Sequence, residues 1–158
     1  MKSLDIDPRS VGPGPVVHPE VAPFWSNVAA GRLCLQVCGT CGIVRYPTSP
    51  ICFACLSFDW TLVPISERGL VASAVIVDRA TGSPEWAATV PYISGLIDMD
   101  IGVRMPGRIL CLCGEGVQRH SVVEAVRVAS ATGTSIFAFA HSCVGDAGSP
   151  PTPTNELP

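Results

Sequence analysis

The chain has 158 residues, enough for one domain of ordinary size or two small ones and too few for a large catalytic barrel. Only 15% of the residues are charged, against roughly 25% in a typical soluble protein, while 47% are hydrophobic and the mean hydropathy is +0.40. This composition excludes a disordered chain and a highly charged nucleic-acid coat. The formal net charge of -3 comes from the two ends, because residues 24–128 hold eight arginines and eight acids. Such a near-neutral, apolar body tends to associate, which predicts either a membrane or a protein partner.

The sequence does not favour the membrane. A spanning helix needs about 20 predominantly apolar residues, and the longest stretch without Asp, Glu, Lys or Arg, residues 128–145, contains serines, threonines and a histidine. Asp5, Asp7 and Pro8 interrupt the segment in which a signal peptide would need its apolar run. We therefore expect a cytoplasmic protein with no membrane contact, and we interpret its eight cysteines as thiols or thiolates.

Proline-rich ends bracket the predicted folded part. Residues 1–21 are expected to form a flexible N-terminal stretch and residues 145–158 a disordered, proline-rich tail. Between them, residues 22–31 carry apolar side chains at one-face spacing, which predicts a short amphipathic helix that ends at Gly31. A strand is expected at residues 33–37, just before a segment rich in cysteine.

Beyond Trp60 the sequence changes to short runs with β character. Turn-forming residues, among them Pro106-Gly107, separate these runs. Five strands in about 75 residues favour a small closed or partly closed barrel over residues 61–144, after a ribbon domain over residues 22–60. The predicted strands are residues 70–77, 92–99, 108–113, 122–129 and 135–141.

Four cysteines have the spacing of a metal site. They form two Cys-x2-Cys pairs, Cys38 with Cys41 and Cys52 with Cys55. Two residues between paired cysteines let a tight turn present both sulfurs to one ion, and two such turns supply the four thiolates of a tetrahedral structural zinc site. We expect one structural zinc per chain. The alternatives are two disulfides or unrelated thiols, and iron in the same sulfur cage.

The other four cysteines have a simpler interpretation. Cys111 and Cys113 alternate with leucines on a predicted strand, so they share one face and are expected to pack as small apolar residues. Cys34 and Cys143 are isolated. A nucleophilic role would need a neighbouring base, and the nearest candidate is His141, two residues before Cys143.

A series of motifs follows one order along the chain: Phe24-Trp25, Gly31-Arg32-Leu33, Gln36, Cys38-x2-Cys41-Gly42, Tyr46-Pro47, Cys52-x2-Cys55, Trp60, Gly69, Pro91-Tyr92, Leu96-Ile97-Asp98, Gly102-Val103-Arg104 and Gly107. This order resembles the OB-fold proteins with an N-terminal rubredoxin-like zinc ribbon that are associated with acyl-CoA metabolism. The resemblance covers roughly residues 23–139. One departure lies at residues 120–123, where His-Ser-Val-Val stands in place of the family's Gly-x-Pro-Val turn. Because a residue with a Cβ does not easily take positive φ, a different turn is expected there.

The resemblance implies a mainly β fold with a short N-terminal helix, a zinc ribbon and a five-stranded OB-fold barrel. It also implies a non-catalytic accessory subunit of a thiolase-like acyl-CoA enzyme, whether a thiolase, an acetyltransferase or an aldolase that cleaves steroid side chains. The catalytic residues would belong to the partner. This chain would support assembly and acyl-CoA binding in a heterotetramer or larger heteromer, in steroid or other lipid catabolism.

Candidate contact residues come from two residue types. Arginine binds phosphate oxygens through planar, bidentate hydrogen bonds, and the candidates for CoA binding are Arg32, Arg45, Arg104 and Arg108. The alternative for each of them is a solvated or salt-bridged arginine, and the sequence favours that alternative. Aromatic residues are enriched among interface hot spots, so Phe24 and Trp25 are candidates for partner binding. Their alternative role is to staple the helix onto the ribbon or the barrel.

The sequence disfavours two other classes of function. OB folds and zinc ribbons both occur in nucleic-acid-binding proteins, but the sequence pI is about 5.5 and there is one lysine, which is a poor match to a phosphate backbone. An independent enzyme is also disfavoured. The chain has no Gly-rich phosphate loop, no Gly-x-Ser-x-Gly elbow and no His-Glu-x-x-His site.

Overall fold

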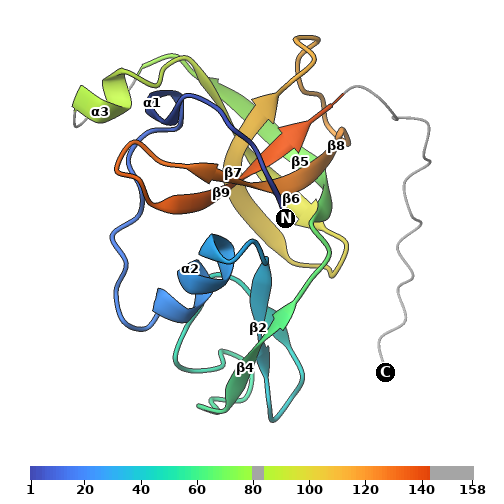
Figure 1. Cartoon of the computed structure of the whole chain (residues 1–158). Helices are drawn as coiled ribbons and strands as arrows, with labels where there is room; N and C mark the ends of the chain where they lie inside the picture. Colours follow the sequence, from blue (N-terminus) through green and yellow to red (C-terminus); the bar gives the residue numbers. More distant parts are fainter. Residues whose placement is uncertain (80–83, 143–158) are drawn as a thin grey trace.

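The computed structural model describes residues 1–79 and 84–142. It contains one three-stranded sheet and one six-stranded sheet. The smaller sheet lies with a helix at one end of the molecule, and the larger sheet curls into a barrel at the other end (Figure 1). The expected proline-rich tail at 145–158 lies outside the described residues.

The smaller sheet is the ribbon. Helix α2 (Ala22–Ala29) precedes it, and Gly31, at φ 76°, turns the chain away from the helix in a conformation that favours glycine. Strand β2 (Cys34–Cys38) is central, with β3 (Val44–Arg45) and β4 (Trp60–Pro64) antiparallel on its two sides. The ribbon therefore joins segments that are distant in sequence; Cys38 ends β2, and the other three metal-site cysteines lie in loops.

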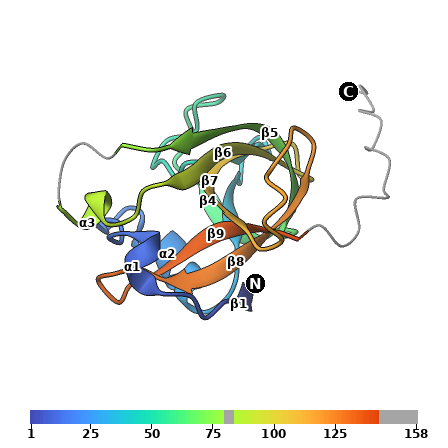
Figure 2. The ribbon, with the colours of Figure 1, turned by 90° about the horizontal axis from the view of Figure 1, so that it is seen from above.

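Five strands of the larger sheet close into a barrel (Figure 2). Antiparallel ladders join β5 to β6, β6 to β7, β8 to β9 and β5 to β8, and one parallel ladder joins β7 to β9 and completes the ring. Closure removes the exposed edges that strands this apolar would otherwise present. The predicted fold class, mainly β with a helix, a ribbon and a five-stranded OB-fold barrel, is confirmed. The strands are β5 (Arg68–Val77), β6 (Tyr92–Met99), β7 (Arg104–Cys111), β8 (Val122–Ala129) and β9 (Ser135–His141).

The prediction of a turn at Pro106-Gly107 was wrong. Pro106-Gly107 is not a turn but lies within β7, where Pro106 is paired with Leu96. The reason is packing, because a Cβ on Gly107 would lie 2.6 Å from the ring of Phe139, so the glycine lets β7 and β9 approach. At residues 120–123, where the sequence departs from the family's turn, His120 takes φ 70° despite its Cβ, and the expected change of turn remains a prediction.

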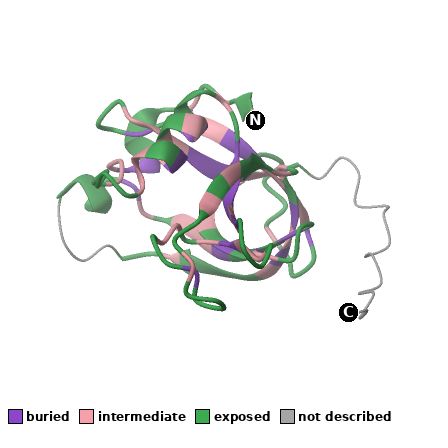
Figure 3. Cartoon of the chain, turned by 90° about the horizontal axis from the view of Figure 1, so that it is seen from below, coloured by how far each residue is buried: buried purple, intermediate pink, exposed green. Residues whose placement is uncertain are grey.

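The main core joins the ribbon to the barrel. Leu33 and Leu35 at the start of the ribbon pack in one cluster with Val71, Ile97 and other inward-facing barrel residues. Buried residues line the inner faces of the strands, and exposed residues cover the ribbon loops (Figure 3). The elements are therefore held together by shared apolar packing.

The N-terminal residues pack on the outside of the barrel. Strand β1 (Lys2–Ser3) pairs in parallel with β8, and the single turn α1 (Pro8–Val11) buries Val11 against Val126 and Val128. This part of the chain therefore lies against the barrel, and the flexibility expected for residues 1–21 remains a prediction. The apolar side chains of this N-terminal segment, which lie between its prolines, pack on apolar residues of the outer surface of β8 and β9. We call residues 1–14 the N-terminal arm.

A second short helix lies beside the arm. Helix α3 (Pro84–Ala87) is adjacent to α1 in both Figure 1 and Figure 2. The contact is close, since a Cβ on Gly12 would lie 3.0 Å from the ring of Trp86. Within the described residues, no helix is long and apolar enough to cross a membrane. The predicted domain boundaries at residues 21, 60 and 144 remain predictions.

Candidate metal centre and its surroundings

Two turns of the same geometry present the four cysteines. In the first, the Cys38 N–H donates to the Ile43 carbonyl and the Gly42 N–H donates back to the Cys38 carbonyl. In the second, the Cys52 N–H donates to the Ser57 carbonyl and the Leu56 N–H donates back to the Cys52 carbonyl. The residue after each pair is left-handed, with φ 73° at Gly42 and 60° at Leu56. The second turn therefore holds a leucine where the first has the conformationally suited glycine.

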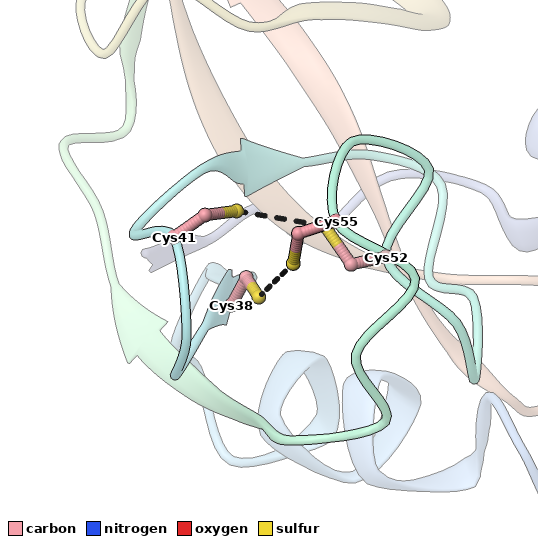
Figure 4. A group of neighbouring side chains, drawn as sticks. All are labelled: Cys38, Cys41, Cys52 and Cys55. Carbon is pink, nitrogen blue, oxygen red and sulfur yellow. Dashed lines mark hydrogen bonds between the residues drawn. The ribbon is translucent and has the colours of Figure 1, made fainter.

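The sulfur atoms lie at the separations of a tetrahedral site (Figure 4). All four Sγ atoms are within 4.8 Å of one another, with 3.5 Å between Cys38 and Cys55 and 3.7 Å between Cys41 and Cys52. A zinc–sulfur distance of about 2.3 Å in a tetrahedron places neighbouring sulfurs about 3.8 Å apart. The four-cysteine donor set thus fits a metal ion, with every position of a four-coordinate ion supplied by protein.

The turns also prepare thiolates. Backbone N–H groups of Cys41 and Thr40 lower the pKa of Cys38 to about 6, and those of Cys55 and Ala54 lower the pKa of Cys52. Although the Ser57 amide acts to lower it, burial and hydrogen bonds shared with the other thiols raise the pKa of Cys55 to about 12. Four sulfurs this close do not all ionise without a cation, and a divalent metal supplies that charge.

A buried arginine fastens the second cysteine turn to the first. Arg45, 3% exposed, donates from Nε to the Gln36 side-chain oxygen and from Nη2 to the Ser49 carbonyl, at 3.0 Å each. The same Gln36 oxygen accepts the Ser49 N–H at 2.9 Å. We call these three residues the clamp. It ties the loop that leads to Cys52 onto the β2–β3 hairpin.

The four candidate CoA-binding arginines do not converge. Arg45 is buried in the clamp, and Arg32 is exposed on the ribbon, where its Nε donates to Asn27. Arg104 and Arg108 both lie on β7, but Arg104 is paired with Asp98 through two hydrogen bonds of 2.6 and 2.9 Å. Arg108 forms no such pair with a described carboxylate. A role of any of the four in CoA binding remains a prediction.

The two helix aromatics pack inward. Phe24 is 3% exposed, and Trp25 stacks on Phe137 of β9 with ring centroids 6.0 Å apart. Phe24 also contacts Phe137, edge to face, with centroids 6.0 Å apart. These contacts are those of a staple between helix and barrel, the alternative that the sequence left open. As folded, Phe24 has almost no surface to offer a partner.

Three strongly exposed apolar residues lie at the second cysteine turn. Phe53, Leu56 and Phe58 are each 71% exposed, and residues 46–58 contain no Asp, Glu, Lys or Arg. We call these three side chains the ribbon patch. The sequence analysis did not predict the ribbon patch. A signal was available, because a segment too short to form its own core carries apolar residues around a cysteine pair.

A second cluster was also missed. The Nδ1 atom of His141 lies 3.9 Å from the Cys111 sulfur and 3.8 Å from the Cys113 sulfur. The strand register brings them together, because Cys111 is directly opposite His141 in the parallel β7–β9 ladder. No local pattern predicts that ladder. Cys143, the other cysteine near His141 in sequence, lies outside the described residues.

Comparison with known families identifies both parts of the fold. Residues 25–61 match the model of the ChsH2 rubredoxin-like zinc ribbon domain, and residues 62–128 match that of the ChsH2 C-terminal OB-fold domain. The chain belongs to the ChsH2 family. This confirms the resemblance inferred from the order of the motifs. In this chain the zinc-ribbon match directly precedes the OB-fold match.

Two curated relatives are longer proteins. A probable enoyl-CoA hydratase alpha subunit of Thermomonospora curvata is 30% identical over 112 residues, which cover 70% of this chain and 34% of that protein. A 3-oxo-4,17-pregnadiene-20-carboxyl-CoA hydratase alpha subunit of Mycobacterium tuberculosis is 33% identical over 105 residues, covering 66% and 32%. The chain thus spans about a third of the length of these relatives.

Solved structures share the fold. One, described as Ltp2-ChsH2(DUF35) aldolase, has a TM-score of 0.70 and 22% identity, covering 81% of this chain and 98% of that chain. A DUF35-family protein of unknown function from Sulfolobus solfataricus has a TM-score of 0.51 and 14% identity, covering 80% and 87%. At these identities the likeness concerns the ribbon-and-barrel architecture.

Proposed function

We propose that this chain is a non-catalytic accessory subunit of a thiolase-like acyl-CoA enzyme, and that it contributes to assembly and to acyl-CoA binding. The ribbon patch is the observation that carries the proposal. Phe53, Leu56 and Phe58 present apolar surface within six residues of sequence, and residues 46–58 contain no charged side chain, although Asp59 follows directly. Exposed apolar groups gathered in one place are typical of protein interfaces.

Backbone strain supports the same interpretation. Leu56 holds φ 60°, a conformation that costs a residue with a Cβ roughly 1 kcal/mol, and its side chain gains almost no burial in return. Glycine at the equivalent place in the first turn avoids this cost. A leucine that destabilises the free chain is accounted for if its side chain is buried in a complex.

The names of similar proteins agree with a subunit role. Both curated relatives are called alpha subunits and act on CoA thioesters by name, and one solved structure with this fold is described as an aldolase. We propose a thiolase-like partner in a heterotetramer or larger assembly, with steroid or other lipid substrates. The nucleic-acid alternative gains nothing, since Arg45 is buried and Arg104 is paired with Asp98.

The proposed metal is one structural zinc, bound by Cys38, Cys41, Cys52 and Cys55. Zinc would supply the positive charge that lets four close sulfurs ionise and would hold the two turns together. With four protein ligands the site keeps no open position for a substrate or water. Iron fits the same ligands, and a purified protein that is red and loses its colour on reduction would replace zinc with iron.

Co-expression with a thiolase-like protein encoded nearby tests the proposal. The two proteins should co-purify, and the Leu56→Gly variant should bind at least about tenfold more weakly, because it loses an apolar contact. The same variant should be as stable as the wild type or more so alone, since glycine relieves the positive-φ strain. Zinc content should not change.

The double variant Val75→Ser/Ile76→Ser is the matched control. These β5 residues are 61% and 72% exposed and lie outside the ribbon patch, so their replacement should leave complex formation unchanged. Failure of the wild type to co-purify with any thiolase-like neighbour would contradict the subunit role. Equal losses in the two variants would contradict the assignment of the interface to the ribbon patch.

A further inference from the structure

A second group of metal-binding side chains lies on the barrel, away from the ribbon. The sulfur atoms of Cys111 and Cys113 are 3.8 Å apart, and the Nδ1 atom of His141 lies 3.9 and 3.8 Å from them. We call these three residues the barrel cluster. Within the described part of the chain, it and the four cysteines of the ribbon are the groups of His, Cys, Asp or Glu whose donor atoms could hold one ion.

The backbone of two strands positions the barrel cluster. Cys111 ends β7 and is directly opposite His141, which ends β9. The Leu112 N–H then donates to the His141 carbonyl at 2.9 Å, which extends the pairing by one bond. Because side chains alternate along an extended chain, Cys113 leaves the same face as Cys111, and Leu112, 53% exposed, lies on the other face. Strand register therefore brings the three donor atoms together.

The separations fit a tetrahedral ion. Zinc–sulfur and zinc–nitrogen distances of about 2.3 and 2.0–2.1 Å place two sulfurs about 3.8 Å apart, and a sulfur and a nitrogen about 3.6 Å apart. The barrel cluster has 3.8 Å between its sulfurs and 3.8 and 3.9 Å from sulfur to nitrogen. Thiolate and imidazole are also the ligands that zinc prefers. Protein would fill three positions of the ion, whereas the ribbon fills all four.

His141 presents one particular nitrogen to the sulfurs. Its side chain is 2% exposed, and its Nε2 atom is closed to solvent with no partner among the described residues. Nδ1 is therefore the nitrogen that an ion beside the two sulfurs reaches. Ligating histidines usually donate their other N–H to an acceptor, which strengthens binding. Without that acceptor and with one thiolate pair instead of two, the barrel cluster should bind zinc more weakly than the ribbon.

The oxidation state of Cys113 controls the donor set. Cys113 is in a disulfide, whereas Cys111 is a free thiol that is partly exposed and lines a pocket of about 340 Å³. A dithiol reductant gives two electrons and two protons to the disulfide and becomes a disulfide itself, so Cys113 is released as a thiol. Zinc then displaces the protons of both thiols, and His141 binds as the neutral imidazole. Only the reduced chain offers all three ligands.

We propose that the barrel cluster binds a second zinc ion when the disulfide of Cys113 is reduced. The ligands are the two sulfurs and Nδ1 of His141, and a water molecule takes the fourth position. This ion joins the ends of β7 and β9, the parallel ladder that completes the barrel. Oxidation of Cys113 releases it. The site uses residues of this chain alone, so it does not depend on the proposed partner.

Metal counting on the full-length chain tests the site. Purified without reductant or added zinc, the wild type should hold one zinc, in the ribbon. Reduced with a phosphine, which binds zinc weakly, and dialysed against zinc, it should hold two, and a chelator should remove the second first. Cobalt added to the reduced, ribbon-loaded chain should show thiolate-to-cobalt charge-transfer absorption. A reduced wild type that stays at one ion, or an unreduced one that takes up two, would overturn the proposal.

Variants locate the second ion. Reduced Cys111→Ser should stay at one zinc, and Cys113→Ser should do so with or without reductant. Cys34→Ala is the matched control, because Cys34 is a free cysteine outside both clusters, and it should bind two. Near-ultraviolet circular dichroism checks each fold, and two cysteine variants keep the test from depending on one of them. A second ion in either folded variant, or an equal loss in Cys34→Ala, would refute the assignment.

Discussion

The cysteine end of the ribbon and the barrel are stabilised by different means. Inside the barrel, Val71, Ile97 and Phe139 are fully buried and contribute to one continuous core. At the cysteine end, Phe53 and Leu56 are 71% exposed, and the two turns are joined by the clamp, the four sulfurs and hydrogen bonds such as that from Thr40 Oγ1 to Ser57 Oγ. Too few residues are present there to bury a core of their own. A region held by a metal keeps its apolar side chains free for other contacts.

The largest effect should come from removing one metal ligand. Cys41→Ser should reduce the zinc content from one ion per chain to near zero, since binding energies of structural zinc sites are on the order of 10 kcal/mol. We expect proteolytic cleavage within residues 38–60, with the barrel strands remaining protected. Mass spectrometry of the fragments and metal analysis measure both effects.

Cys34→Ala is the control for that variant. Cys34 is buried on the same strand as Cys38 but lies outside the sulfur cluster, so its loss should not change the zinc content. If Cys41→Ser kept one zinc and the wild-type cleavage pattern, the ribbon would not depend on its metal. The contrast with the barrel would then fail.

A cavity in the barrel should lower the stability of the whole fold and leave the zinc content unchanged, the opposite of what is expected for Cys41→Ser. Phe139→Ala removes a fully buried ring and should lower the free energy of unfolding by about 3–5 kcal/mol, as urea denaturation would measure. The molecules that remain folded should keep one zinc each. Phe58→Ala, an exposed ring of the ribbon patch, should change the stability of the free chain by less than about 0.5 kcal/mol. A comparable loss in both variants would argue against the contrast.

The clamp should matter less than the metal but more than any surface arginine. Arg45→Leu removes two hydrogen bonds from a buried charged group, so we expect a loss of roughly 1.5–3 kcal/mol and a faster release of zinc to a chelator. Arg32→Ala, at an exposed site of the ribbon, should do neither. Identical zinc release rates in the wild type and Arg45→Leu would remove the clamp from the metal site.

Local patterns predicted the parts of this fold whose signals are local. The Cys-x2-Cys spacing predicted four sulfurs that do meet, and the strands β6, β8 and β9 have the predicted bounds. The errors arose where contacts with segments distant in sequence determine the local structure. Gly107 is required by Phe139 on another strand, so it looked like part of a turn.

Distance in sequence also hid the candidate sites. From the sequence, Arg45 was a candidate phosphate ligand. Its hydrogen-bond acceptors, Gln36 and Ser49, are brought next to it only by the folded structure. Arg108 differed from Arg104 only once the arm and Tyr92 were placed around it. Phe53 and Phe58 became informative once their exposure was known. Residue type and spacing do not determine which charges are paired or which apolar groups are exposed.

The smallest effect concerns the ion pair on the surface of the barrel. The Arg104 guanidinium holds the pKa of Asp98 below its ordinary value of 3.8. A carboxyl group with a lowered pKa in the folded state stabilises the fold above its unfolded pKa, and this contribution is lost as the pH falls through the folded value. Both side chains are about half exposed, so Asp98→Asn should cost less than about 1 kcal/mol at neutral pH. The difference between variant and wild type in urea denaturation should shrink with added salt and disappear as the pH falls through the folded-state pKa of Asp98, which lies below 3.8. A loss that persisted in acid, or that matched the loss in Arg45→Leu, would mean that the surface of the barrel depends on its charges as strongly as the ribbon depends on its clamp.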